Sequence, residues 1–224
     1  MTIAAIPNVP KINLDQLLLR VQPVDALIQA GSGTLARLIQ DAENGWASHA
    51  GTFLSVGWAQ GVPAPIPTSD PGAIISIGEC SASEPPDMLS QHSNWGFSII
   101  EVTPRLSGET VRCFHLPLRT PATPDQQAAE ARWWIEKDAT HPGYGLFDLP
   151  AFDIYLHLKE WFPLVPWPAP HGGLVCSTSV MSAKCASGQI LASDRPGYDP
   201  DSATPQDVVN DPLFDISMMT EILA

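Results

Sequence analysis

Hydrophobic positions along the first half of the chain follow a helical spacing and then an alternating one. "NLDQLLLR" (13–20) and "SGTLARLIQDA" (32–42) have the spacing of helices, and Ser32 is the predicted N-cap of the second. On that second helix, Leu35, Leu38 and Ile39 are predicted to share one face. Segments rich in β-branched residues and bounded by Gly or Pro predict strands at 48–57, 72–80, 96–104 and 109–118.

The second half of the chain predicts further helices. "TPDQQAAEARWWIEKDA" (123–139) has Thr123 as N-cap, Pro124 at the first helical position and Gln126 completing a capping box. Helical patterns also cover 148–162, 175–188 and 204–209. Gly188 is the predicted end of the second of these helices, and the third begins with the same Thr-Pro pair, Thr204-Pro205. Helices, then strands, then helices predict an α+β domain in which helices pack on an antiparallel sheet.

Prolines mark the segments that we expect to be loops. Ten of the 23 prolines among the 224 residues lie within 57–72, 83–95 and 163–173. Proline is excluded from helix interiors and central strands, so these segments are predicted to be surface loops around a compact core. Apolar residues make up 44 % of the chain, enough for one globular domain that spans residues 1–224.

The charge and the terminal sequence limit the partners and the location. A net charge of −13 argues against nucleic acid and anionic membrane surfaces, because no basic stripe can neutralise phosphates. No apolar run approaches the ~18 residues that a membrane-spanning helix needs. The N-terminus has no basic segment followed by an apolar one, so we expect no signal peptide and a protein that is cytoplasmic as synthesised.

The cysteines and histidines do not have metal-ligand spacing. Four cysteines in a chain of this length are too few for a disulfide scaffold, and the sequence contains no C-x-x-C and no histidine pair at helical spacing. We therefore expect no metal and no cofactor. Cys80, Cys113 and Cys185 are interpreted as packing residues.

Cys176 and His49 are the candidates for chemistry. In "HGGLVCSTSVMSAKCASG" (171–188), Cys176 comes where a helix is predicted to begin, and unpaired N–H groups there favour a thiolate. Those N–H groups can also hold the oxyanion that forms when a thiolate attacks a carbonyl. Taken alone, each residue is better explained as a buried packing residue than as a catalytic one: Cys176 as a small buried residue, and His49 as a core histidine among its small neighbours in "WASHAG" (46–51).

Together the two motifs resemble a known family. "WASHAGTFLS" is similar to the histidine motif, and "VCSTSVMSAK" to the cysteine motif, of the permuted papain-like hydrolases, the YiiX/YaeF-like branch of the NlpC/P60 superfamily. "GECSAS" (78–83) resembles the segment with the acidic residue, and "TPQDVVNDPLFD" the closing motif. The chain departs from the family at Thr178-Ser179, where Glu-Leu is usual, and at Val24-Asp25, where Gly-Asp is common.

The resemblance implies a circularly permuted papain-like fold and a catalytic triad. Cys176 would be the nucleophile and His49 the general base, and the histidine precedes the cysteine as a permutation leaves it. Glu79 is the preferred third residue, to orient His49, and Glu101 is the alternative. His171, five residues before Cys176, is a rival base in a Pro/Gly loop that we expect only to line the cleft.

The resemblance also implies a function. The family cleaves amide bonds through a cysteinyl acyl-enzyme, so a peptide or peptidoglycan-type substrate is expected. Lipid acyl transfer or thioester hydrolysis by the same pair, and a catalytically silent binding module, are the alternatives. Without a signal peptide, a peptidoglycan hydrolase needs export by a non-Sec route, for example as an antibacterial effector with an immunity or secretion-system partner.

Overall fold

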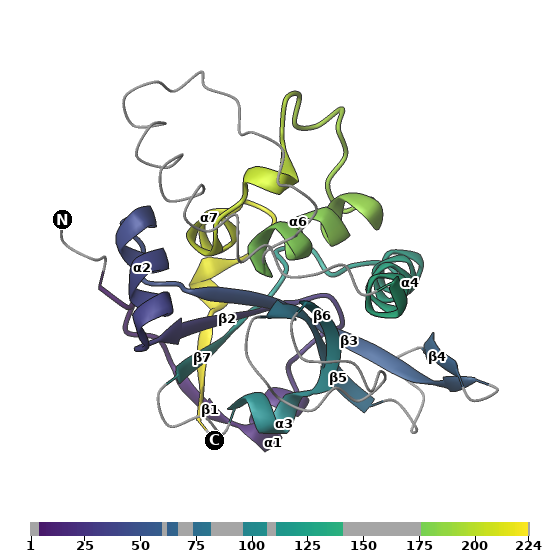
Figure 1. The fold of residues 1–224 in the computed structure, drawn as a ribbon. Coiled ribbons are helices and arrows are strands. Elements are labelled where there is room, and N and C mark those ends of the chain that lie inside the picture. The colour runs from purple at the N-terminus through teal and green to yellow at the C-terminus, as the bar shows by residue number, and fades with distance from the viewer. Residues whose placement is uncertain are drawn as a thin grey trace.

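The computed structural model describes residues 5–59, 62–66, 74–81, 96–106, 111–140 and 176–223. Within these residues the protein has an α+β architecture in which helices pack on a mixed β-sheet (Figure 1). The predicted helix at 148–162 and the predicted loops at 83–95 and 163–173, with His171, lie outside the described residues.

The sheet has eight strands in the order β1-β8-β7-β2-β3-β5-β6, and β4 pairs with β3 beside this path. Their bounds are β1 (Lys11–Asn13), β2 (Ala26–Gly31), β3 (His49–Ala59), β4 (Val62–Pro65), β5 (Ile74–Ser81), β6 (Gly96–Glu101), β7 (Val111–Leu116) and β8 (Thr220–Leu223). All strand pairs are antiparallel except β1 with β8, which are parallel. The expectation of an antiparallel sheet was therefore wrong for this one pair.

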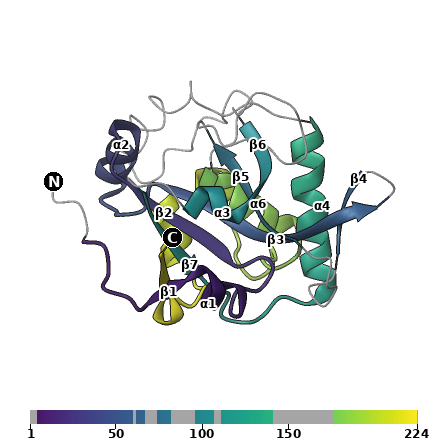
Figure 2. The ribbon, with the colours of Figure 1, turned by 90° about the horizontal axis from the view of Figure 1, so that it is seen from below.

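Helices lie on both faces of the sheet. The helices are α1 (Leu14–Leu18), α2 (Thr34–Glu43), α3 (Val102–Leu106), α4 (Pro124–Thr140), α6 (Cys176–Ala186) and α7 (Pro205–Asn210). In Figures 1 and 2, α4, α6 and α7 cover one face, whereas α1 and α3 lie on the other. None of the helices in the described segments is long and apolar enough to cross a membrane.

The central strand β2 buries side chains on both faces of the sheet. Ala26 and Ile28 pack in the cluster that includes Trp134 of α4 and Val180 of α6. Leu27, between them, packs in a second cluster on the opposite face. A strand that is buried on both faces reads as a short continuous apolar run without alternation. This explains why β2 ("ALIQAG") gave no strand signal of its own in the sequence.

Several predicted helix ends are confirmed. In α4, Thr123 Oγ1 accepts a hydrogen bond from the Gln126 backbone N–H, and Gln126 Oε1 accepts one from the Thr123 N–H, so the predicted capping box is present. α7 begins with Pro205 after the capping residue Thr204. Gly188, which follows α6, has a φ of 74°, the left-handed conformation that favours glycine at a helix end.

Other local predictions were wrong. α2 begins one residue later than expected: its N-cap is Gly33 rather than Ser32, and no side chain caps the first turn. Leu38 of this helix is 59 % exposed, so it does not share a buried face. The strand predicted over 96–104 ends at Glu101, and the next residues turn into α3. The predicted loop 57–72 contains the end of β3 and all of β4, whose two prolines are tolerated because β4 is an edge strand.

Candidate active site

The thiol of Cys176 lies at the first residue of α6, and only 2 % of this residue is exposed. Backbone N–H groups of Ala50 and Ser177 donate hydrogen bonds to its sulfur. The first N–H groups of a helix have no intrahelical partner and carry the positive end of the helix dipole. The local structure at the start of α6 therefore favours the thiolate form of Cys176.

His49 contacts both Cys176 and Glu79. It is the first residue of β3, and its Nε2 lies 3.0 Å from Oε2 of Glu79 on β5. The ring also shares a hydrogen bond with the side chain of Cys176. Because Nε2 faces the carboxylate, Nδ1 is the nitrogen left for the sulfur. The three side chains thus form a continuous chain of thiol, imidazole and carboxylate.

The pairing of β3 with β5 explains the contact between His49 and Glu79. Gly51 lies opposite Glu79, so His49 is the diagonal neighbour of this carboxylate on the same face. A Cβ atom on Gly51 would lie 2.9 Å from Cγ2 of Ile77, too close without a shift of β5. Gly78, next to Glu79, likewise admits Trp134, whose ring would lie 2.6 Å from an added Cβ. Both glycines let neighbouring elements approach closely around Glu79.

The electrostatics of this group favour an ion pair between Cys176 and His49. Burial by itself would raise the pKa of Cys176, but the positive charge of His49, its hydrogen bond and the backbone N–H groups outweigh burial and lower the pKa. Burial would likewise lower the pKa of His49, but the negative charges of Cys176 and Glu79 raise it to about 9. The lowered pKa of Cys176 and the raised pKa of His49 both favour the pair of thiolate and imidazolium.

The other sequence candidates do not join this group within the described part of the chain. Glu101 is the last residue of β6, lies opposite Ser76 and is exposed, whereas Glu79 is fully buried. His171 lies outside the described residues. Cys80 is buried on β5 with a pKa that burial raises well above the ordinary thiol value, and burial also raises the pKa of Cys185.

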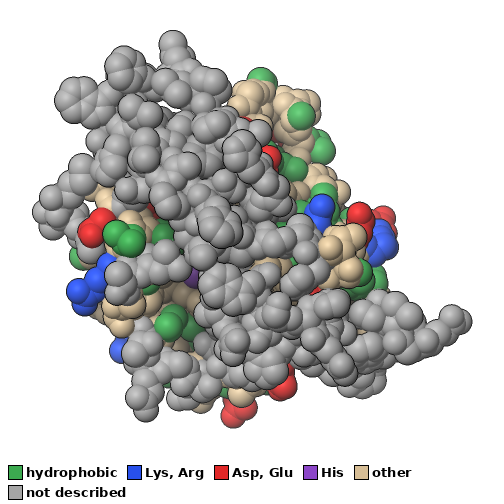
Figure 3. Space-filling model, in the orientation of Figure 1, with side chains coloured by type: hydrophobic (Ala, Val, Ile, Leu, Met, Phe, Trp, Pro, Cys, Tyr) green, Lys and Arg blue, Asp and Glu red, His purple; other side chains and the backbone are tan. Residues whose placement is uncertain are grey.

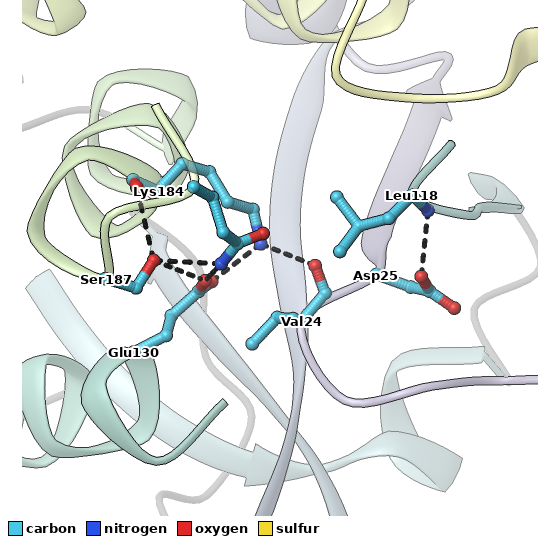
Figure 4. A network of polar contacts seen from close by, with 7 residues as sticks. Val24, Asp25, Leu118, Glu130, Lys184 and Ser187 are labelled. Carbon is cyan, nitrogen blue, oxygen red and sulfur yellow. Dashed lines mark hydrogen bonds and ion pairs between the residues drawn. The ribbon is translucent and has the colours of Figure 1, made fainter. Parts of the chain in front are cut away.

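A buried ion pair anchors the helix that carries Cys176, and the sequence analysis did not anticipate it. Lys184 Nζ of α6 lies 2.7 Å from Oε1 of Glu130 on α4, and neither side chain is exposed. Lys184 also donates a hydrogen bond to the carbonyl of Val24 (Figure 4). Ser187 adds a hydrogen bond to Glu130. A lysine on the apolar face that includes Val180 and Met181 was the available sequence signal.

The turn that Lys184 holds is strained. Val24 has a φ of 72°, a left-handed conformation that is rare for β-branched residues. Glycine adopts this conformation readily, so the strain follows from the valine at this position. Val24 is fully buried, and its N–H donates to the carbonyl of Phe53. Packing and hydrogen bonds on both sides therefore hold the backbone in this conformation.

A second pair of histidine and carboxylate, in this case with both side chains buried, lies beside this turn. His115 Nε2 lies 2.8 Å from Oδ2 of Asp25, and Oδ1 of Asp25 accepts a hydrogen bond from the backbone N–H of Leu118. The His115 ring packs edge-on against Phe53. Asp25 also accepts a hydrogen bond from the N–H of Gln22, so the pair ties the start of β2 to β7.

A separate cavity of about 370 Å³ opens between α4 and the β3–β4 hairpin. Its lining includes Pro23 and Val24, Pro65 and Ile66, and the α4 residue Arg132, but neither Cys176 nor His49. On the face drawn in Figure 3, charged side chains of described residues form small separate groups and no basic patch.

The chain matches no family model and no curated protein.

Proposed function

We propose that this protein is a cysteine-dependent acyl hydrolase in which Cys176 is the nucleophile, His49 the general base and Glu79 the residue that orients His49. The observation that carries the proposal is the contact chain from Cys176 through His49 to the buried Glu79. A buried thiol with a lowered pKa beside a histidine with a raised pKa is the arrangement that a cysteine nucleophile requires.

The geometry supports a two-step reaction. The Cys176 thiolate attacks the carbonyl carbon of the substrate, and the resulting oxyanion is held by N–H groups at the start of α6. The His49 imidazolium gives its proton to the leaving group, the bond to that group breaks, and a thioester remains on Cys176. His49, now neutral, removes a proton from water, which attacks the thioester; the carbon–sulfur bond breaks, the acid is released, and the Cys176 thiolate and His49 imidazolium are restored.

We further propose that the bond cleaved is an amide, in a peptide or peptidoglycan-type substrate, and that the fold is the permuted papain-like one. The support is the order His49, Glu79, Cys176 along the chain, together with the helix start that presents the cysteine. Amide, ester and thioester substrates share the acylation step. They are told apart by the products released from a dipeptide amide, a lipid ester and an acyl thioester.

The first test is thiol labelling. Brief treatment with iodoacetamide at about pH 6, read by mass spectrometry, should modify Cys176 at least tenfold faster than Cys80, Cys113 or Cys185. At this pH an ordinary thiol with a pKa of ~8.5 is almost fully protonated, whereas the His49 charge lowers the pKa of Cys176 and so raises its thiolate fraction. Equal labelling of all four cysteines in the folded protein would contradict a catalytic thiolate and favour a silent binding module.

The role of Glu79 is tested with a matched pair of variants. Glu79→Gln should lower kcat by about 10- to 100-fold, because an amide removes the negative charge that stabilises the His49 imidazolium but keeps the shape. Glu101→Gln on the neighbouring strand should change kcat by less than twofold. The pH profiles of both variants should be measured, since loss of the Glu79 charge lowers the pKa of His49 and moves the alkaline limb to lower pH. If Glu101→Gln lowers kcat strongly and Glu79→Gln does not, Glu101 rather than Glu79 is the residue that orients His49.

A further inference from the structure

A carboxyl group from α2 lies beside the Cys176 site, and the triad does not use it. Glu43 is the last residue of α2, just ahead of the segment that leads to His49. Its Oε2 accepts a hydrogen bond of 3.0 Å from the backbone N–H of Gln206, and the Thr204 side chain adds another. These two residues open α7, so Glu43 joins the end of α2 to the start of α7.

The second oxygen of the Glu43 carboxyl is buried but accepts no hydrogen bond from the described residues. Oε1 of Glu43 is shielded from solvent and has no hydrogen-bond partner among the described residues. A buried polar atom without a partner costs free energy that the fold normally avoids. In an active site such an atom is explained when the substrate supplies the partner.

The protonation state decides what this oxygen can offer. Burial raises the pKa of Glu43 to about 9, and the charges of Cys176 on α6 and Asp207 on α7 add to the effect of burial, while the Gln206 and Thr204 hydrogen bonds oppose it. Glu43 is therefore a neutral carboxylic acid at pH 7. Since Oε2 already accepts the hydrogen bond of the Gln206 N–H, the proton belongs on Oε1, which becomes a donor.

The position of Glu43 relies on the same contacts that place Cys176. The charge of the Cys176 thiolate influences Glu43 directly, so the two side chains lie within short electrostatic range. Ser177, next to Cys176, donates a hydrogen bond of 2.7 Å to the carbonyl of Ala203, the residue before the Thr204 that contacts Glu43. One short stretch of chain thus fixes both the nucleophile and this acid.

We propose that the Glu43 carboxylic acid donates a hydrogen bond from Oε1 to the carbonyl oxygen that Cys176 attacks. The inference rests on the proposed function, since it assigns Glu43 a place beside the reacting carbonyl. Glu43 keeps its proton throughout and stabilises the oxyanion together with the N–H groups of α6. It also selects substrates whose acyl oxygen can accept this hydrogen bond.

The test compares two reagents that both consume Cys176. With p-nitrophenyl acetate, the sulfur attacks a carbonyl, an oxyanion forms and p-nitrophenolate leaves. With methyl methanethiolsulfonate, the sulfur attacks sulfur, a mixed disulfide forms and methanesulfinate leaves, without any oxyanion. Glu43→Met should slow acetylation about 100-fold while changing the disulfide-forming rate less than threefold. Glu43→Gln, whose amide is a neutral donor of the same length, should slow acetylation less than tenfold.

The controls separate this proposal from the proposed function. Asp41→Met, at an exposed position of the same helix, should affect neither rate. Rates are expressed per Cys176 thiol, identified by mass spectrometry, that the methanethiolsulfonate modifies in protein with the native circular dichroism spectrum, so a misfolded fraction does not enter the comparison. Equal slowing of both reactions by Glu43→Met, or equal acetylation by the Met and Gln variants, would overturn the role of Glu43. A wild-type protein that reacts quickly with neither reagent would overturn the proposed function.

Discussion

Replacing His49 with alanine is expected to lower kcat/KM by at least about 10⁴-fold, the scale of effect seen when a base that acts as a unit with its nucleophile is removed. The variant loses the proton acceptor and also the positive charge that lowers the pKa of Cys176. Without that charge, burial raises the pKa of Cys176, so iodoacetamide labelling of Cys176 at pH 6 should also become slower in this variant. The measurement is turnover and iodoacetamide labelling on one preparation.

Two comparisons make this expectation specific. The double variant Cys176→Ala/His49→Ala should be no less active than either single variant, because the two residues act in the same step. His115→Gln removes a buried histidine that contacts the carboxylate of Asp25, and it should lower stability while leaving rapid labelling of Cys176. If His171→Ala abolishes turnover and His49→Ala does not, His49 is not the base.

Replacing Lys184 with methionine is expected to destabilise the protein by about 3–5 kcal/mol, the usual cost of leaving one member of a buried ion pair without its partner. The substitution leaves the Glu130 carboxyl buried without a cation and the Val24 carbonyl without its donor. Urea unfolding monitored by tryptophan fluorescence measures the loss. Lys11→Met, which removes an exposed lysine 3.6 Å from Glu221, should cost less than about 1 kcal/mol.

The pH dependence of this loss has a definite sign. Burial raises the pKa of Glu130 above its ordinary value of 4.5, and Lys184 opposes that shift. Without Lys184 the folded protein holds Glu130 in its neutral form, so the penalty is present above pH 4.5 and shrinks as the pH falls towards that value. The variant Lys184→Met/Glu130→Leu should recover part of the stability. A Lys184→Met protein with unchanged stability at pH 7 would contradict the anchoring role of the pair.

The sequence predicted the elements whose signals are local. The caps of α4 and α7, the start of α6 at Cys176 and the strand that opens with His49 all depend on residues within one or two turns of each other. The positions of Cys176 at a helix start and of His49 at a strand start also made these two residues candidates for chemistry. The strands β1 and β8 were not predicted, because they have only three and four residues and pair with each other from opposite ends of the chain.

By itself the sequence determined the class of the fold and the chemical types at the candidate site, since spacing and capping act along the chain. It did not decide whether Glu79 or Glu101 contacts His49, because the alternation of residues along one strand does not show which strand lies next to it in the sheet. Tertiary structure decided that contact through the register that sets Gly51 opposite Glu79. It also decided the ionisation of Glu43 and the burial of Lys184, because desolvation and charge pairing depend on segments that only folding brings together.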